Sequence, residues 1–151
     1  PMRLTIRTDY ALRVLMTLAV VVEGRLVTID ELAGRHRVSR THLMKVVNRL
    51  ARAGIVEATR GRGGGIRLAR RPADINLGEV VRTTEPQCAL VDCAGCRQLR
   101  RCRLPAVLDQ ASRAFLQTME SYTLADILDE SWPAQIANDR DVPAARIAAS
   151  L

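Results

Sequence analysis

The chain of 151 residues is 48% hydrophobic but only 3% aromatic, which excludes a wholly disordered protein and predicts a core of Leu, Val, Ile and Ala in packed helices. No apolar run is long enough to span a bilayer, no leader opens the chain and no basic helix carries bulky membrane anchors, so a cytoplasmic protein is expected. Its net charge of +7 is concentrated in residues 1–71, with 15 Lys or Arg against 5 Asp or Glu, whereas residues 72–151 hold 8 against 11, and a basic half predicts a partner with a phosphate backbone.

Two helices are predicted near the start of the chain. The first follows Thr8, which is expected to cap it, and its apolar residues recur at helical spacing: Ala11, Leu12, Val14, Leu15, Leu18, Ala19 and Val22. The second is short and ends near Arg35. Thr28 and Glu31 have the spacing of a capping box, in which two backbone N–H groups are satisfied reciprocally, so they mark its start.

A third predicted helix completes a helix-turn-helix. Ser39 is expected to cap this helix and Gly54 to end it. Only a tight link from His36 to Ser39 separates it from the second helix, which is the spacing of a helix-turn-helix. The longer third helix is therefore the predicted recognition helix. It carries the apolar residues Leu43, Met44, Val46, Val47, Leu50 and Ala51.

A β-hairpin is predicted directly after the recognition helix. Residues 55–59 alternate as a strand should, residues 61–65 turn the chain, and residues 66–68 return as the partner strand. A hairpin in this place is the wing of a winged helix. The glycine-rich turn lacks the Lys-Ser or Lys-Thr ending of a P-loop, which disfavours a nucleotide site.

Polar side chains of the helix-turn-helix and wing are the predicted DNA contacts. Arg, Asn and Thr on a recognition helix match base edges in a major groove, and wing arginines suit phosphate or a narrow minor groove. A solvated face is the usual explanation for one polar helix, but the adjoining capped helix, hairpin and positive charge favour DNA. The predicted contacts are Thr28, Ser39, Arg40, Thr41, His42, Lys45, Asn48, Arg49, Arg60, Arg62, Gly63, Gly64 and Arg67.

The second half of the chain is predicted to carry a cysteine loop and a dimerisation helix. A helix over residues 77–85 is ended by Pro86, and Pro105 suits the first turn of a long helix reaching about Thr118. A short helix is expected over residues 122–128. The apolar stripe of the long helix requires a partner; its residues are Leu104, Val107, Leu108, Ala111, Phe115 and Met119.

These elements predict a mainly α fold with three parts. A winged helix-turn-helix domain is expected over residues 2–72 and the cysteine loop with the dimerisation helix over residues 73–130. Residues 131–151 show no clear periodicity and are expected to form a flexible tail.

All four cysteines lie between Cys88 and Cys102, spaced C-x4-C-x2-C-x5-C. In a reducing compartment this clustering favours metal binding over disulfides, and nearby arginines stabilise thiolates. The spacing leaves open an iron–sulfur cluster, a four-Cys zinc site, and a redox dithiol at Cys93 and Cys96. An enzyme is disfavoured because no thioredoxin-like strand and helix surround Cys93.

Several segments resemble those of the iron–sulfur winged-helix transcription regulators. They are MRLT at residues 2–5, TDYALR at 8–13, VSRTHLMKVVN at 38–48 and RGRGGGI at 60–66. The segments EP at 85–86, LVDC at 90–93, CRL at 102–104 and YTLAD at 122–126 are most similar to the nitric-oxide-sensing repressor branch, NsrR. The resemblance covers about residues 2–130, nearly the whole domain.

The resemblance implies a homodimeric repressor that binds a near-palindromic operator in double-stranded DNA. It implies one iron–sulfur cluster per subunit, 4Fe-4S in preference to 2Fe-2S, bound by Cys93, Cys96 and Cys102 with Asp9 of the partner subunit as fourth ligand. Without the resemblance, Asp9 is interpreted as a first-turn acid stabilised by the helix dipole. Nitric oxide or another oxidant is the implied signal, and its reaction with the cluster lowers DNA affinity.

Two features depart from the family pattern. Only two residues separate Cys93 from Cys96, where the family usually has four or five, and Cys88 is an added thiol. Cys88 is therefore an alternative ligand: it could replace one of the three cysteines, displace Asp9, or remain a bystander.

The histidines disfavour the related IscR branch, which has a histidine shortly after its third cysteine. The only histidines here are His36 and His42, in the DNA-reading region, where they are expected to be surface or DNA-facing residues. The rival function from another class is a zinc-stabilised protein that binds DNA constitutively.

Overall fold

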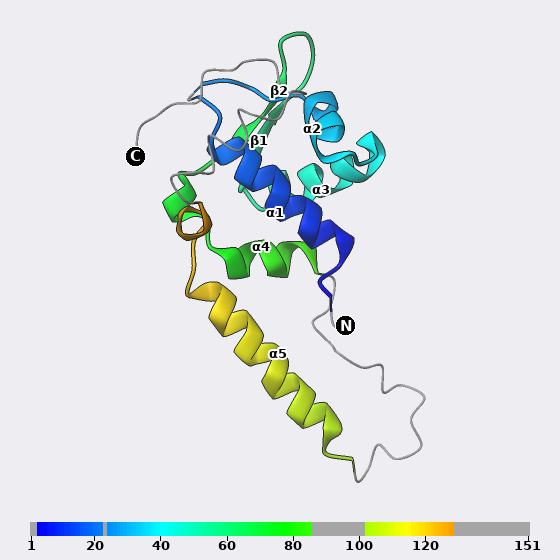
Figure 1. The fold of residues 1–151 in the computed structure, drawn as a ribbon, viewed down its shortest axis with the longest axis vertical. Helices are drawn as coiled ribbons and strands as arrows, with labels where there is room; N and C mark the ends of the chain where they lie inside the picture. Colours follow the sequence, from blue (N-terminus) through cyan, green and yellow to red (C-terminus); the bar gives the residue numbers. More distant parts are fainter. Residues whose placement is uncertain (1–2, 23, 86–101, 129–151) are drawn as a thin grey trace.

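The structure is a computed structural model that describes residues 3–22, 24–85 and 102–128. It is mainly helical (Figure 1). In chain order the elements are α1 (Ile6–Ala19), α2 (Ile29–His36), α3 (Arg40–Arg52), β1 (Val56–Thr59), β2 (Gly65–Leu68), the 3-10 turn η1 (Pro72–Asp74), α4 (Leu77–Thr84), α5 (Leu104–Glu120) and the 3-10 turn η2 (Ala125–Ile127). The strands pair antiparallel, with Glu57 opposite Arg67. The predicted mainly α fold with a hairpin after the third helix is confirmed.

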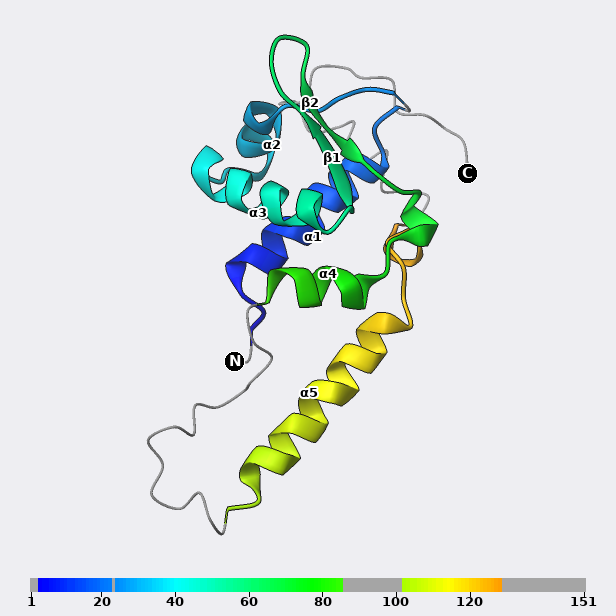
Figure 2. The ribbon, with the colours of Figure 1, turned by 180° about the vertical axis from the view of Figure 1, so that it is seen from behind.

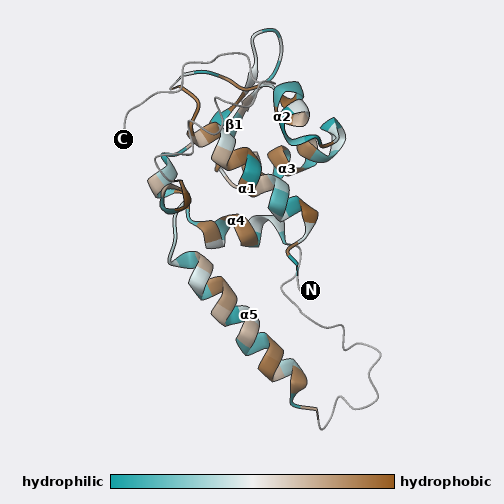
Figure 3. Ribbon diagram, viewed as in Figure 1, coloured by the Kyte–Doolittle hydropathy of each residue, from teal (hydrophilic) through white to brown (hydrophobic). Residues whose placement is uncertain are grey.

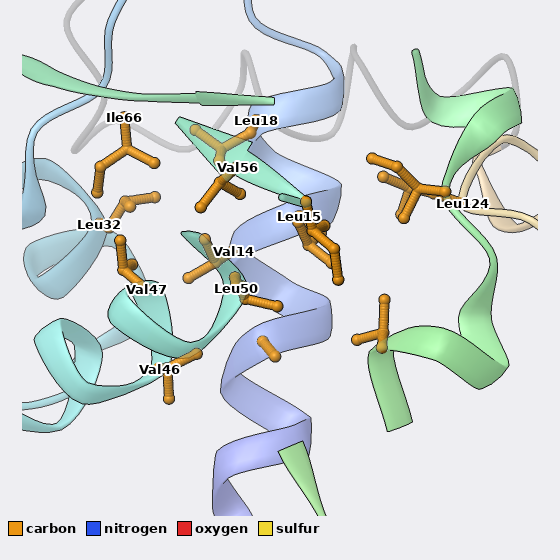
Figure 4. Packing of buried hydrophobic residues seen from close by; sticks show 14 of the residues in the cluster. Val14, Leu15, Leu18, Leu32, Val46, Val47, Leu50, Val56, Ile66 and Leu124 are labelled. Carbon is orange, nitrogen blue, oxygen red and sulfur yellow. The ribbon is translucent and has the colours of Figure 1, made fainter. Parts of the chain in front are cut away.

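The core lies around α1, which packs against α3, α4 and β2. Leu15 of α1 and Leu50 of α3 are fully buried, and Leu124 lies at the edge of the cluster, next to Ile75 (Figure 4). Each such leucine contributes about 1.5–3 kcal/mol through removal of its apolar surface from water. The core therefore fixes α3 against α1, while α5 extends away from this body in both views (Figures 1 and 2).

The predicted caps of α2 and α3 are confirmed. The Thr28 hydroxyl accepts from the Glu31 N–H at 3.2 Å, and the Glu31 carboxylate accepts from the Thr28 N–H at 2.7 Å. Ser39 Oγ accepts from the His42 N–H at 3.2 Å. Between the helices Arg37 adopts the left-handed conformation (φ 52°), which reverses the chain within the short link.

Substitution of the α2 cap is expected to lower stability. Thr28→Ala should cost about 1 kcal/mol, because it leaves a helix-terminal N–H without its acceptor. Chemical denaturation monitored by circular dichroism measures this loss, and Thr28→Ser, which keeps the hydroxyl, should unfold like the parent protein. Equal losses in both variants would contradict the capping role.

Both ends of α1 differ from the prediction. The helix begins at Ile6 with Thr5 as its N-cap residue, so Thr8 is not the cap. Thr8 lies inside the helix and is fully buried. Its hydroxyl bonds Thr84 and Glu85 at the end of α4, which satisfies the buried polar group. The helix ends at Ala19, so Val22 lies beyond it, consistent with the low helix propensity of the β-branched residues 20–22.

The region after α5 is also less helical than expected. Residues 122–128 contain only the 3-10 turn η2. The Thr123 backbone N–H and hydroxyl both donate to the Asp126 carboxylate and hold its pKa below the ordinary value. This closed turn satisfies the polar groups locally, so the chain does not continue into a regular α-helix.

Among the described residues, α5 packs against α4, and polar contacts attach its C-terminal end to the body. Asn76 Nδ2 donates to the Glu120 carbonyl at 2.6 Å, Arg82 forms an ion pair with the Glu120 carboxylate, and Leu124 N–H donates to the Ile75 carbonyl at 2.8 Å. None of the residues of α5 is buried. None of the helices in the described ranges combines the length and apolar character needed to cross a membrane.

Candidate nucleic-acid interface and cysteine site

The recognition helix α3 has one buried face and one exposed face. Leu43, Val46, Val47 and Leu50 are buried against the rest of the core. The opposite face exposes most of the predicted DNA contacts on this helix, whereas Arg49 is half-buried on its flank. The exposed ones are Arg40, Thr41, His42, Lys45 and Asn48. The structure thus brings these predicted contacts together on one solvent-facing surface.

The hydroxyl caps also lie on this surface. Thr28 and Ser39 are exposed at the starts of α2 and α3. Each hydroxyl oxygen accepts from a backbone N–H, which leaves its O–H free to donate. Both residues can therefore donate to a phosphate oxygen without losing the capping bond.

The wing presents its arginines on a turn that requires glycine. Gly61 and Gly63 have φ of 93° and 75°, and a Cβ on Gly64 would lie 2.3 Å from the Thr59 carbonyl oxygen. A side chain at Gly64 would therefore displace the strand backbone. Arg60 and Arg62 are exposed on this turn, and the described residues offer neither of them an ion pair.

Two predicted contacts already carry acidic partners. The Arg67 guanidinium lies 2.7 Å from the Glu57 carboxylate across the β ladder, and Arg40 Nε lies 3.1 Å from Asp30 Oδ1, linking α3 to α2. All four side chains are at least half exposed. Such exposed pairs are weak and leave other guanidinium donors available, so the arginines can still bind phosphate or a base edge.

The anchorage of the wing was not predicted. Val27 and Ile66 exchange backbone hydrogen bonds of 2.9 and 2.8 Å, which attach β2 to the segment before α2. Val27 forms a single β-bridge, and the residues around it do not alternate as in a strand. The sequence pattern therefore gave no indication of this pairing. This pairing holds the wing beside the helix-turn-helix.

Arg62→Ala is expected to weaken DNA binding equally on all sequences. Loss of one phosphate contact should reduce the slope of log affinity against log salt by about 1, because one fewer counterion is released. Fluorescence anisotropy over a salt series measures the slope. Arg71→Ala is the control, because Arg71 pairs with Asp74 outside this surface. An unchanged slope in Arg62→Ala would exclude the wing turn from the interface.

Only part of the predicted metal site lies in the described residues. Cys88, Cys93 and Cys96 fall outside them, whereas Cys102 is half-buried immediately before α5. Asp9 lies in the first turn of α1, with its side chain 46% exposed and 3.0 Å from Arg13 Nε. Within the described ranges no three potential metal ligands come together. The Cys102 thiol is the type of donor that binds iron–sulfur clusters, and the Asp9 carboxylate is an accessible oxygen donor.

The two described candidates belong to separate parts of the molecule. Asp9 is at the start of α1, which lies beside the end of α4. Cys102 precedes the start of α5, which is the end of that helix farthest from the body (Figures 1 and 2).

The two histidines lie in the DNA-reading region. His36 Nε2 is 3.0 Å from Thr17 Oγ1, and His42 is exposed on α3.

A partly buried polar cluster joins α1 to the end of α4. Glu85 Oε1 accepts from the Thr5 N–H at 2.8 Å, the Thr5 hydroxyl at 3.0 Å and the Thr8 hydroxyl at 2.5 Å. The hydroxyls of Thr8 and Thr84 are 2.7 Å apart. Glu85 is the last described residue before the cysteine segment. The cluster therefore connects the turn bearing Asp9 to the chain that enters this segment, and sequence reasoning missed it.

The long helix α5 exposes an apolar face. Leu104, Val107 and Phe115 have relative exposures of 51%, 57% and 37%, and apolar residues recur along the helix (Figure 3). Leu108 and Met119, which belong to the same predicted stripe, are half-buried. The described residues of the chain therefore cover only part of the apolar stripe of α5 and leave the rest exposed.

Comparison with known proteins identifies the family. The model of the Rrf2 family, described as iron-dependent transcriptional regulators, matches residues 4–130. The chain belongs to the Rrf2 family. This Rrf2 protein is therefore a DNA-binding transcription regulator and not an enzyme, which removes the dithiol oxidoreductase alternative. The predicted resemblance is confirmed at the level of the family, and the nitric-oxide-sensing branch stays a prediction.

Solved structures agree with this fold. The Rrf2 protein is similar to T. potens IscR, with 26% identity and a TM-score of 0.69 over 89% of this chain and 91% of that chain. CymR, described as the global cysteine regulator of B. subtilis, is 23% identical with a TM-score of 0.63 over 84% and 96%. Staphylococcus aureus CymR is 20% identical with a TM-score of 0.63 over 83% and 99%. The two CymR structures show the shared fold alone.

Proposed function

We propose that this Rrf2 regulator is a cytoplasmic homodimeric repressor whose operator affinity is controlled by an iron–sulfur cluster in each subunit. The observation that carries the proposal is the separation of Asp9 from Cys102. Asp9 is accessible at the start of α1, Cys102 precedes the far end of α5, and α5 exposes an apolar face for a second chain. A two-subunit site uses all three features.

The proposed ligands are the cysteine thiolates and one carboxylate. Cys93, Cys96 and Cys102 would hold the cluster with Asp9 of the partner subunit, and Cys88 is the alternative ligand. A 4Fe-4S cluster is preferred to 2Fe-2S. When bound, the cluster supplies iron that can react with nitric oxide or another oxidant, or report iron status.

The described contacts provide a route from this site to α3. The Glu85 cluster ties the start of α1 to the chain entering the cysteine segment, and α1 packs directly on α3. If the cluster no longer bound Asp9 or the cysteine segment, α1 would be free to move relative to the other subunit. Because α1 packs on α3, α3 would move with it. A difference of about 1.4 kcal/mol between the two states changes DNA affinity tenfold.

The proposed DNA-reading surface consists of α3, the caps of α2 and α3, and the wing. In a dimer, two such surfaces would meet half-sites about 34 Å apart, one turn of the double helix. A near-palindromic operator matches that symmetry.

The proposal is tested on full-length protein purified without oxygen. We expect visible absorption, a dimer mass with one cluster per subunit by native mass spectrometry, and tighter operator binding before than after treatment with a nitric oxide donor. The operator is first selected from a random duplex library. Colourless zinc-containing protein that binds the operator equally before and after treatment would instead establish the constitutive DNA-binding alternative.

A further inference from the structure

We propose that Asp30 determines base specificity by positioning the Arg40 side chain. The inference rests on the proposed DNA-reading surface and deepens it, because it assigns a role to an acidic residue that is not itself a predicted DNA contact. Asp30 lies in the first turn of α2 and Arg40 is the first residue of α3. Their ion pair, 3.1 Å from Nε to Oδ1, spans the two helices of the helix-turn-helix.

Asp30 is mounted on a rigid support. The capping box of Thr28 and Glu31 fixes the turn that carries Asp30, and Leu32, two residues later, is fully buried. The link to α3 is closed by the Val38 N–H, which donates to the Ala33 carbonyl at 3.1 Å. The carboxylate therefore occupies a defined position relative to the start of α3.

The pair is too exposed to serve stability. The side chains of Arg40 and Asp30 have relative exposures of 64% and 75%, and an exposed ion pair typically contributes only about 0–1 kcal/mol. A negative charge on a surface that meets phosphates also opposes DNA binding. Asp30 therefore adds little to stability and lowers the general affinity for DNA. A role in orienting Arg40 explains its presence on this surface.

Orientation follows from the geometry of the guanidinium. The Asp30 oxygen lies closest to Nε, at one edge of the planar group. The guanidinium has five donors, so donors on the Nη atoms are left for a second acceptor pair. Guanine presents O6 and N7 in the major groove, which match two parallel N–H donors. Holding the side chain in place before binding reduces the entropy lost when this contact forms.

The first test compares Asp30→Ala, Asp30→Asn and the control Asp74→Ala in full-length protein. The probes are the duplex selected from a random library, its single-base variants and an unrelated duplex. We expect Asp30→Ala to reduce the preference for guanine at one position of each half-site by about tenfold while binding the unrelated duplex more tightly. Asp30→Asn keeps an acceptor oxygen and should fall between. Asp74 pairs with Arg71 at 2.8 Å outside the surface, so Asp74→Ala should leave base preference unchanged.

A double-mutant cycle identifies the residue through which Asp30 acts. Arg40→Ala should lose the same preference, and the double variant should match Arg40→Ala, because Asp30 then has no side chain to position. A uniform rise in affinity for every duplex in Asp30→Ala and Asp30→Asn would overturn the proposal, since charge alone would explain it. An unchanged preference in Arg40→Ala would overturn it by removing Arg40 from the DNA-reading surface. None of these outcomes alters the absorption spectrum, so failure here is distinct from failure of the cluster proposal.

Discussion

The Cys102→Ala protein is expected to lose its visible absorption and the nitric oxide response of its DNA binding. Cys102 is the predicted thiolate nearest to α5 in sequence, directly before its N-cap residue Arg103, so its loss would release the cysteine segment from the dimerisation helix. Operator affinity should fall by about 5–150-fold, the usual range for coupling between two sites. Anaerobic absorption spectra and fluorescence anisotropy, with and without a nitric oxide donor, measure both effects.

Cys88→Ala is the comparison for this substitution, and it decides whether Cys88 is a ligand. It removes one thiol from the same segment, and the colour and response should persist if Cys88 is a bystander. Cys102 is only half-buried, so its replacement should not unfold the domain, and far-ultraviolet circular dichroism checks this. Cys102→Ala protein that kept both its colour and its gas-responsive binding would contradict the proposed function.

A charge placed on the exposed face of α5 is expected to produce a monomer. Val107 and Phe115 lie about two helical turns apart on this face, and none of the residues of α5 is buried within its own chain. The double variant Val107→Asp with Phe115→Asp should therefore fold but dissociate, because two carboxylates cannot be buried in an apolar interface without a large desolvation cost. Sedimentation velocity measures the mass.

Dissociation should also weaken operator binding strongly. A dimer gains from binding its second half-site intramolecularly, and loss of that gain is expected to lower affinity by about 10²–10⁴-fold. Gln117→Asp provides the control, because Gln117 is exposed and lies on the opposite side of the helix; it should remain dimeric. Dimeric Val107→Asp/Phe115→Asp protein with normal operator affinity would show that this face is not the interface.

The DNA-reading region could be predicted because its sequence patterns involve residues only a few positions apart. The capping box of Thr28 and Glu31, the Ser39 cap and the glycine turn each act over a few residues, and each forms as expected. The same locality explains the failure at Thr8. Its hydroxyl bonds Thr84 and Glu85, which are 76 and 77 positions away, and no local pattern distinguishes a buried threonine of this kind from a cap.

By itself, the sequence determined the helix-turn-helix, the wing and the family, because caps, turns and apolar spacing are encoded within single elements. Only the tertiary structure decided which side chains share a surface. It placed Asp30 against Arg40, tied Glu85 to the start of α1, and divided the apolar stripe of α5 into a half-buried part and an exposed part. These arrangements depend on how separate elements pack, since contact across elements is set by the core and not by the spacing within any one of them.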